Sequence, residues 1–131
     1  MSQDNIEIMR QHFRTWNAGD MEAHRELYDP DVIVRMPEDF PERGPFFGRE
    51  AVMGQVERQV ETFDANELEL ITDFIVLGDR LLVRFIWHGI GRGPAADIEV
   101  SGLYTVRRGR ILAMEFFRNH AEALEILGVR E

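Results

Sequence analysis

Two residues have the type and setting for acid–base chemistry, Asp39 and His12. Asp39 follows a predicted strand and Pro37 and precedes Phe40, and a carboxylate held against apolar side chains can abstract a proton. His12 lies in a stretch with helical periodicity, and a histidine can serve as a base near neutral pH. Each has a plainer interpretation as well: Asp39 as a solvated loop acid beside Glu38, and His12 as a helix histidine that a neighbouring group satisfies.

The composition removes most other chemistries. The chain has no cysteine and no lysine, so every basic side chain is an arginine or a histidine. Thiol nucleophiles, Schiff-base chemistry and a phosphate-loop lysine are therefore excluded. Serine occurs only at Ser2 and Ser101, and neither lies in a nucleophile-elbow pattern. What remains is acid–base chemistry by Asp, Glu, His or Tyr, carboxylate chemistry, or no chemistry at all.

The sequence predicts neither a metal nor a cofactor. The four histidines, at positions 12, 24, 88 and 120, show no metal-ligand spacing. The stretch "GIGRG" at 89–93 resembles a nucleotide loop only superficially, because it leads to Pro94 and another strand rather than to a helix that could receive phosphate. We interpret it as the tip of a hairpin.

Length and charge predict one acidic domain that spans residues 1–131. The formal net charge is −9, which argues against nucleic acid or an anionic membrane as a partner. No apolar stretch approaches the ~20 residues needed to cross a bilayer. The N-terminus also lacks a basic start followed by an apolar run, so we expect no secretory signal and a soluble, cytoplasmic protein.

The periodicity of apolar residues predicts helices first and strands after them. Spacings of three and four at Ile6, Met9, Phe13 and Trp16 indicate a helix over residues 5–17, and "NAGD" ends it and starts another. Residues 37–48 form a loop rich in proline and phenylalanine. The predicted helices are 5–17, 21–28, 49–63 and 120–127, and the predicted strands are 32–36, 68–77, 80–89, 98–106 and 111–117. This order is typical of an α+β fold.

Alternation along residues 80–89 predicts which side chains point inward. Val83, Phe85 and Trp87 form an apolar set that faces the core, whereas Arg84 and His88 face the other way. Because Trp87 and His88 cannot both point inward from a regular strand, we expect His88 on the outer face.

Three segments carry a resemblance to a known family. The stretch "FRTWNAGDMEAHRELYDPDVIVRMP", then "GREAV", then "YTVRRGRILAMEFFRNHAEALEILG" resemble the nuclear transport factor 2-like superfamily, and more narrowly its SnoaL-like and ketosteroid-isomerase-like branch. The resemblance implies a cone-shaped (cystatin-like) roll in which three N-terminal helices pack on a strongly bent mixed or antiparallel sheet, with a short C-terminal helix. It also implies an apolar pocket inside the cone and a homodimer through the outer sheet face.

The resemblance implies a set of pocket residues but not a complete catalytic set. In the ketosteroid-isomerase branch the base is an aspartate directly before the proline, a position that Met36 occupies here, and a second oxyanion donor aligns near Gly102. His12 lies close to the branch's oxyanion-binding tyrosine. Aligned with the family, the strands point Trp87, Gly102, Tyr104, Met114 and Phe116 inward. The expected ligand-pocket residues are Trp16, Tyr28, Arg35, Met36, Phe40, Trp87, Tyr104, Met114, Phe116 and Arg118.

The two arginines of that set have two possible partners. Arg35 and Arg118 could bind a substrate carboxylate, or they could form salt bridges with acids of the chain such as Asp31 or Asp39. The salt bridge is the favoured interpretation.

Two hypotheses of function follow. The first is a cofactor-independent isomerase, cyclase, dehydratase or hydrolase that acts on a small apolar organic substrate, with His12 and Asp39 as acid–base residues. The second is a non-catalytic ligand-binding or dimerisation module of the same fold. In either case we expect a homodimer through an outer face that carries Arg84, His88, Glu99 and Glu115.

Overall fold

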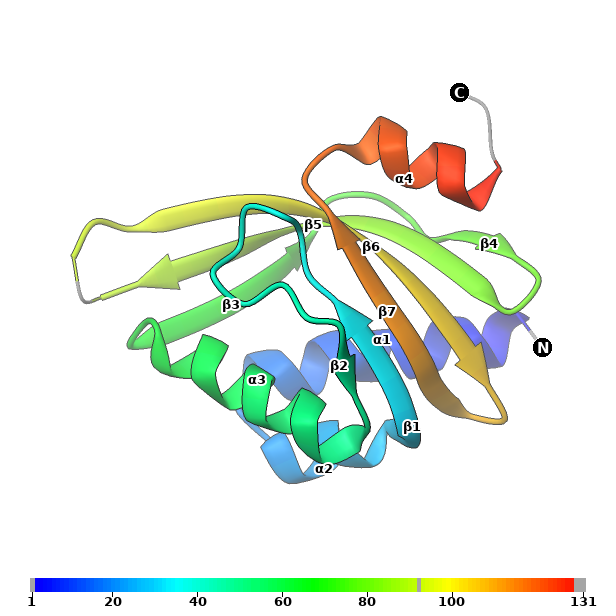
Figure 1. The fold of residues 1–131 in the computed structure, drawn as a ribbon, viewed down its shortest axis with the longest axis horizontal. Helices are drawn as coiled ribbons and strands as arrows, with labels where there is room; N and C mark the ends of the chain where they lie inside the picture. The colour runs from blue at the N-terminus through cyan, green and yellow to red at the C-terminus, as the bar shows by residue number, and fades with distance from the viewer. Residues whose placement is uncertain (1, 92, 129–131) are drawn as a thin grey trace.

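A computed structural model describes residues 2–91 and 93–128 of the protein. Three helices, α1 (Ser2–Ala18), α2 (Met21–Glu26) and α3 (Arg49–Glu61), lie on one side of a bent sheet, and α4 (His120–Leu127) lies on the other (Figure 1). The strands are β1 (Tyr28–Arg35), β2 (Phe46–Phe47), β3 (Ala65–Leu70), β4 (Ile75–Leu77), β5 (Arg80–Ile90), β6 (Ala96–Arg107) and β7 (Arg110–Phe117).

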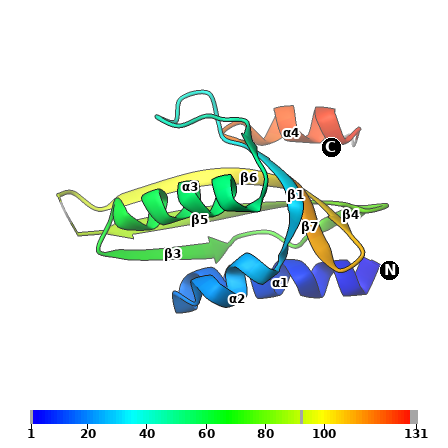
Figure 2. The same cartoon turned by 60° about the horizontal axis from the view of Figure 1, so that its bottom comes forward.

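The sheet is mixed and strongly bent, as predicted. Its strand order is β2-β1-β7-β6-β5-β3, with β4 also paired to β5, and only the β1–β7 pair among those described is parallel. The long strands β5 and β6 form its centre, and Figure 2 shows them nearly edge-on between α4 above and α1 below. The long β5–β6 ladder provides the curved wall against which the helices pack.

The turn between α1 and α2 forms as the sequence predicts. Gly19 has a φ of 70°, a left-handed conformation that ends a helix at little cost for glycine. The Asp20 side chain then accepts a hydrogen bond of 3.2 Å from the backbone N–H of Ala23, which caps α2. This tight connection fixes how α2 lies against α1.

Two apolar clusters hold the layers together. The larger one lies inside the bend and includes Phe13 of α1, Val52 of α3, and Val83 and Phe85 of β5. The smaller one lies on the outer face, where α4 covers Leu82, Leu103 and Phe117. Because both faces of the central strands are covered, the neighbours Leu82 and Val83 are both buried although they point to opposite sides.

Several predicted elements have different bounds in the structure, and the predicted loop at 37–48 contains the short strand β2. The helix predicted for 21–28 ends at Glu26, and Tyr28 begins β1 instead. The strand predicted for 68–77 is two strands, because the backbone leaves the ladder after Ile71, where the Thr72 hydroxyl accepts from the Arg84 N–H in place of a backbone carbonyl. A side chain that imitates a backbone acceptor interrupts a strand without any proline or glycine.

Candidate functional site

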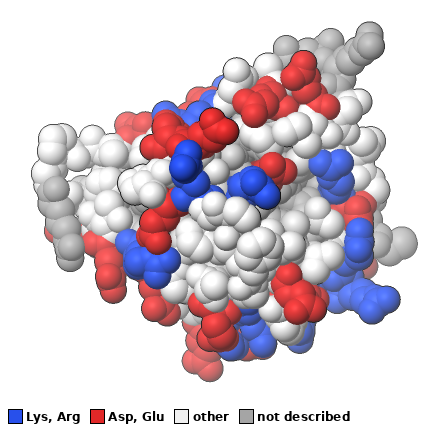
Figure 3. Space-filling view, viewed as in Figure 1, with Lys and Arg blue, Asp and Glu red and all other residues white. Residues whose placement is uncertain are grey.

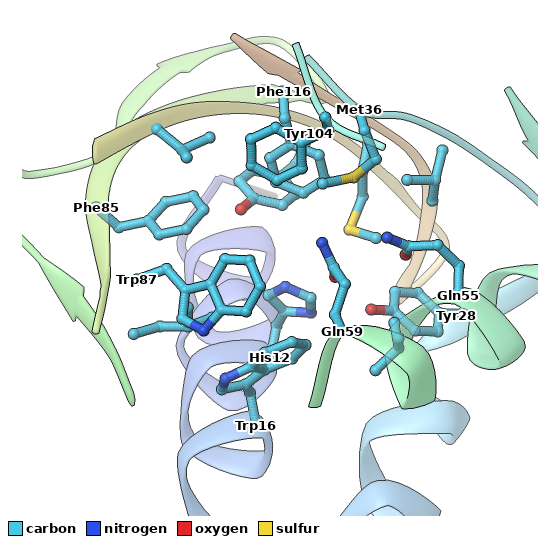
Figure 4. Close-up of a pocket in the computed structure, with 16 residues that line it drawn as sticks. His12, Trp16, Tyr28, Met36, Gln55, Gln59, Phe85, Trp87, Tyr104 and Phe116 are labelled. Atoms are coloured by element: carbon cyan, nitrogen blue, oxygen red, sulfur yellow. The ribbon is translucent and has the colours of Figure 1, made fainter. Parts of the chain in front are cut away.

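A cavity of about 50 Å³ lies inside the bend, between α1, α3 and the inner face of the sheet. Figure 4 shows side chains from all of these elements around it. The sequence-predicted residues that line it are His12, Trp16, Tyr28, Met36, Phe40, Trp87, Tyr104, Met114 and Phe116. The inward direction predicted for Trp87, Tyr104, Met114 and Phe116 therefore agrees with the geometry.

Helical spacing places the polar part of the lining. His12 and Trp16 are four residues apart on α1, so both project from its buried face. Gln55 and Gln59, also four apart, project from α3 beside Val56. The sequence analysis missed both glutamines, although Gln55 lies three residues after Val52 and thus on the same helical face. Polar residues at the spacing of a buried apolar stripe were the available signal.

Three buried polar atoms in this lining have no hydrogen-bond partner among the described residues: His12 Nδ1, Trp16 Nε1 and the Tyr104 hydroxyl. Buried polar groups in folded proteins are almost always paired, so unpaired ones indicate a role for a ligand or an ordered water. In Figure 4 the Tyr104 hydroxyl, the His12 ring and the Gln59 amide reach toward the centre of the pocket from three different walls.

A chain of hydrogen bonds through Thr15, His24 and Tyr28 lies behind His12 and fixes the tautomer of His24. The Thr15 hydroxyl donates to the His12 carbonyl oxygen over 3.1 Å, so its oxygen accepts from His24 Nδ1–H over 2.8 Å. His24 Nε2 then accepts from the Tyr28 hydroxyl, also over 2.8 Å. Tyr28 therefore lines the cavity with its hydroxyl already engaged, whereas Tyr104 has its hydroxyl free for another partner.

Burial keeps the titratable groups of the cavity neutral. It lowers the pKa of His12 well below 6.5, with a further contribution from His24, and it lowers the pKa of His24 to about 4. It raises the pKa of the hydroxyls of Tyr28 and Tyr104 above 10. At neutral pH the cavity thus presents an uncharged imidazole and uncharged hydroxyls. Such groups can accept a proton or donate hydrogen bonds to an oxygen.

A wider outer hollow of about 350 Å³ lies next to the cavity. Phe40, Gln55, Gln59 and Trp87 line both spaces, and we refer to these four residues as the neck. The loop at 37–45 crosses the mouth of this hollow, and hydrogen bonding from the Met36 N–H to the carbonyl of Arg43, 2.8 Å long, closes its base.

Two ion pairs hold the loop from opposite sides. Asp39 pairs with Arg118 at 3.0 Å, at the end of β7, and Glu42 pairs with Arg58 of α3 at 2.8 Å. All four side chains are well exposed, and Figure 3 shows acidic and basic side chains next to each other on this side of the molecule. Asp39 and Arg118 also line a third hollow of about 340 Å³.

Three predicted site residues lie away from the deep cavity. Asp39 and Arg118 stand at the mouth as each other's partners, which is the salt bridge that the sequence analysis favoured. Arg35 is exposed on β1, since Val34 takes the inward position of that strand, and it lines only the third hollow. The structure therefore brings His12 to the cavity but does not bring Asp39 beside it.

His88 and the other expected outer-face residues lie as predicted. His88 sits between Glu69 and Asp97, at 2.7 Å from each, and these two carboxylates raise its pKa. Arg84 pairs with Glu99 on the same face.

The described residues contain no group of three or more His, Cys, Asp or Glu side chains that could hold a metal ion. Over residues 2–91 and 93–128, no helix is long and apolar enough to cross a membrane.

A bent, unclosed mixed sheet that curls around an internal cavity, with three helices on its concave side, defines the cone fold of nuclear transport factor 2-like proteins. Within that class, the SnoaL-like domain matches residues 9–114, and the chain belongs to this family. No curated protein sequence matches the chain at a significant level.

Solved structures share the fold at low identity. Bal32a, from a soil-derived mobile gene cassette, is 22% identical with a TM-score of 0.79 over 87% of this chain and 88% of its own. TerC, crystallised with polyporic acid, is 23% identical with a TM-score of 0.76 over 95% and 98%. A protein from Catenulispora acidiphila with a ketosteroid isomerase-like fold, in complex with trimethylamine, is 17% identical with a TM-score of 0.74 over 95% and 94%.

Proposed function

We propose that this SnoaL-like chain binds a small, mostly apolar organic molecule in the cavity, and that His12 transfers a proton to or from it without a cofactor. The observation that carries the proposal is the set of unpartnered polar atoms on His12, Trp16 and Tyr104 within an otherwise largely apolar lining. An unpaired buried polar group costs about 1–3 kcal/mol, which a bound molecule with a suitable oxygen recovers.

The similar structures support a small-molecule role. TerC holds polyporic acid and the Catenulispora acidiphila protein holds trimethylamine, so proteins with this fold accept small organic compounds. In this chain Phe40 and Trp87 of the neck lie between the deep cavity and the outer hollow. A ligand larger than the deep cavity can extend through that neck.

The geometry favours His12 over Asp39 as the acid–base residue. His12 is buried in the cavity lining and is neutral, so it can accept a proton. The Asp39 carboxylate is exposed and is bound to Arg118. It would have to leave that partner before it could act on a molecule in the deep cavity.

Binding has a built-in reporter, because the chain has two tryptophans and both line the cavity. We would screen acetophenone, cyclohexenone and styrene oxide by quenching of Trp16 and Trp87 fluorescence. A compound that occupies the cavity quenches the wild type. Phe40→Ala, which removes a ring from the lining that the two spaces share, alters the affinity. If none of the three compounds quenches the tryptophan fluorescence at any concentration up to its solubility, the proposal is wrong.

Proton transfer is tested by deuterium exchange at the methyl group of acetophenone in D₂O, followed by NMR. Neutral His12 accepts a proton from that carbon, the resulting enolate oxygen receives a hydrogen bond, and a solvent deuteron returns to the carbon. We expect exchange faster than in buffer for the wild type and for Asp39→Asn, and exchange at the buffer rate for His12→Asn. The opposite pattern assigns the role to Asp39.

A non-catalytic ligand-binding role is the second candidate. It is favoured by one observation: among the described residues, no aspartate or glutamate lines the deep cavity, so the imidazole of low basicity has no carboxylate to assist it. Quenching by acetophenone without deuterium exchange supports this role.

We also propose a homodimer through the outer sheet face. Arg84, His88, Glu99 and Glu115 lie there on neighbouring strands, as the sequence analysis expected. Their side chains are only partly buried or exposed, so they are free to meet a second copy of the chain.

A further inference from the structure

Gly102 lies directly beneath the ring of Tyr104. The two residues are two positions apart on β6, so both point toward the cavity side of the sheet. A β-carbon at position 102 would lie 2.5 Å from the Tyr104 hydroxyl oxygen and 2.7 Å from two carbons of the ring. Carbon atoms do not approach that closely, so no other residue at position 102 leaves the ring where it is.

Gly102 is the position without a side chain in its row across the three central strands, so the ring of Tyr104 has space there and not over the neighbouring strands. Gly102 pairs with Val83 on one side and with Phe116 on the other, and both partners carry side chains. The ring of Tyr104 packs edge to face on Phe116 and on His12, with centroids 5.8 Å and 5.6 Å away. The gap above Gly102 therefore sets the position of the Tyr104 hydroxyl.

That hydroxyl is an unused hydrogen-bond donor. Tyr104 is fully buried, and its oxygen has no partner within the described part of the chain. Tyr28, the other tyrosine of the lining, already donates to His24, so Tyr104 is the tyrosine that can bind a ligand.

The lining also restricts the charge of the atom that Tyr104 can meet. Among the described residues around the deep cavity there is no arginine, aspartate or glutamate, and the chain has no lysine. A carboxylate, phosphate or ammonium group would lose its hydration there without an opposite charge, which is strongly unfavourable. An uncharged oxygen acceptor loses little and gains one hydrogen bond.

We propose that the cavity selects molecules with an uncharged carbonyl oxygen and that the Tyr104 hydroxyl donates a hydrogen bond to this oxygen. Gly102 is the residue that positions this donor. The proposal rests on the proposed binding function. Gly102 itself touches no ligand in this arrangement. Its contribution is the absence of a side chain.

The first experiment compares two probes of nearly the same shape, acetophenone and α-methylstyrene, which has a methylene group in place of the carbonyl oxygen. Affinities come from tryptophan quenching. We expect the wild type to prefer acetophenone about tenfold, as one hydrogen bond to a buried donor would give. Tyr104→Phe should bring this preference close to one while the affinity for α-methylstyrene stays unchanged.

Gly102→Ala should also reduce the preference for acetophenone, because it moves the hydroxyl. In the Tyr104→Phe background, adding Gly102→Ala should change the preference no further. If Gly102 had only a structural role, Gly102→Ala would weaken the binding of both probes equally, and by the same factor in the wild type and in Tyr104→Phe. Either result overturns the positioning role. A wild type that binds both probes equally overturns the carbonyl selectivity.

The second experiment needs no ligand and measures the midpoint of urea unfolding. Gly102→Ala should lower it clearly in the wild type and much less in the Tyr104→Leu background, because the shorter side chain no longer covers position 102. Gly89→Ala is the matched control: a β-carbon there would lie 2.4 Å from the Phe63 ring, so it is disruptive but independent of Tyr104.

The two experiments separate the possible failures. If neither probe binds, the proposed function and the carbonyl selectivity fail, while the unfolding data still decide whether Gly102 makes room for Tyr104. If Gly102→Ala lowers the midpoint equally in both backgrounds, as Gly89→Ala should, the placement of Tyr104 by Gly102 is wrong.

Discussion

His12 and His24 stack inside the protein with their ring centroids 4.7 Å apart, and both side chains are buried. Burial lowers both pKa values, that of His24 to about 4, whereas a histidine in the unfolded chain titrates near 6.5. Between these pH values the unfolded state binds more protons than the folded state. The free energy of unfolding is therefore highest above pH 6.5 and falls as the pH decreases toward 4.

Protonation of His24 alone should lower the free energy of unfolding by roughly 3 kcal/mol as the pH falls from 6.5 to 4. Urea unfolding at several pH values measures it. His24→Gln should be less stable near neutral pH, because the ring that bridges the Thr15 and Tyr28 hydroxyls is lost, but its stability should decline less steeply as the pH falls. An equally steep decline in the variant would show that other groups cause the acid sensitivity.

At the scale of elements, the proposed binding function gives the loop at 37–45 control of the route into the cavity. It carries Phe40 into the neck, and it is held by Asp39–Arg118 on one side and Glu42–Arg58 on the other. Exposed ion pairs of this kind contribute only about 0–1 kcal/mol each to stability and weaken with salt. The loop can therefore open without unfolding the protein.

We expect Asp39→Asn combined with Glu42→Gln to change the free energy of unfolding by less than about 1–2 kcal/mol but to speed the entry and release of acetophenone. Stopped-flow tryptophan fluorescence measures both rates. Added salt should speed the wild type and have less effect on the variant. Glu7→Gln, which removes the exposed pair with Arg14 on α1, is the control and should leave the rates unchanged.

Helix α4 belongs to the outer cluster and not to the cavity. Leu124 is 5% exposed and packs in that cluster, whereas Ile126 is 45% exposed. Leu124→Ala should cost about 2–5 kcal/mol of unfolding free energy in urea titrations, and Ile126→Ala about 0.5 kcal/mol or less. Neither should alter the binding of acetophenone. If folded Leu124→Ala bound acetophenone more weakly than the wild type, packing in the outer cluster would influence the cavity.

Local patterns were sufficient for the order and type of the main elements and for the inward face of α1 and β5. Spacings of three and four located α1 and with it His12 and Trp16, and alternation along β5 gave the inward direction of Phe85 and Trp87. These patterns work because one side of each element must be apolar to be buried. The resemblance supplied the parity of β6 and β7.

Other features depend on partners that local patterns do not reveal. The pair Asp39–Arg118 joins residues 79 positions apart, and the sequence offered both Asp31 and Asp39 as acids. Thr72 interrupts a strand only because the Arg84 N–H lies opposite its hydroxyl. Tyr28 was expected in a helix, which concealed its place in the chain of hydrogen bonds through His24.

At the scale of the whole molecule, net charge works against self-association. Each chain carries a formal charge of −9, and the outer face of β3, β5 and β6 includes Glu69, Asp97 and Glu99. Arg84 and His88 neutralise part of this acidity by pairing within the chain. A dimer through this face must therefore overcome a repulsion that salt screens.

We expect light scattering to give a mass of twice the 15.2 kDa of one chain, with a dimer fraction that rises as salt is added. Arg84→Glu should dissociate the dimer, because it leaves Glu99 unpaired and adds a negative charge at the centre of the face. Arg14→Glu makes the same change of charge on α1, away from the sheet, and should leave the mass unchanged.

Since His88 is held protonated by Glu69 and Asp97 until the pH exceeds its raised pKa, the wild-type dimer should also weaken as the pH rises through that value. A mass of one chain under all these conditions, or equal effects of the two substitutions, would show that this face does not form the interface.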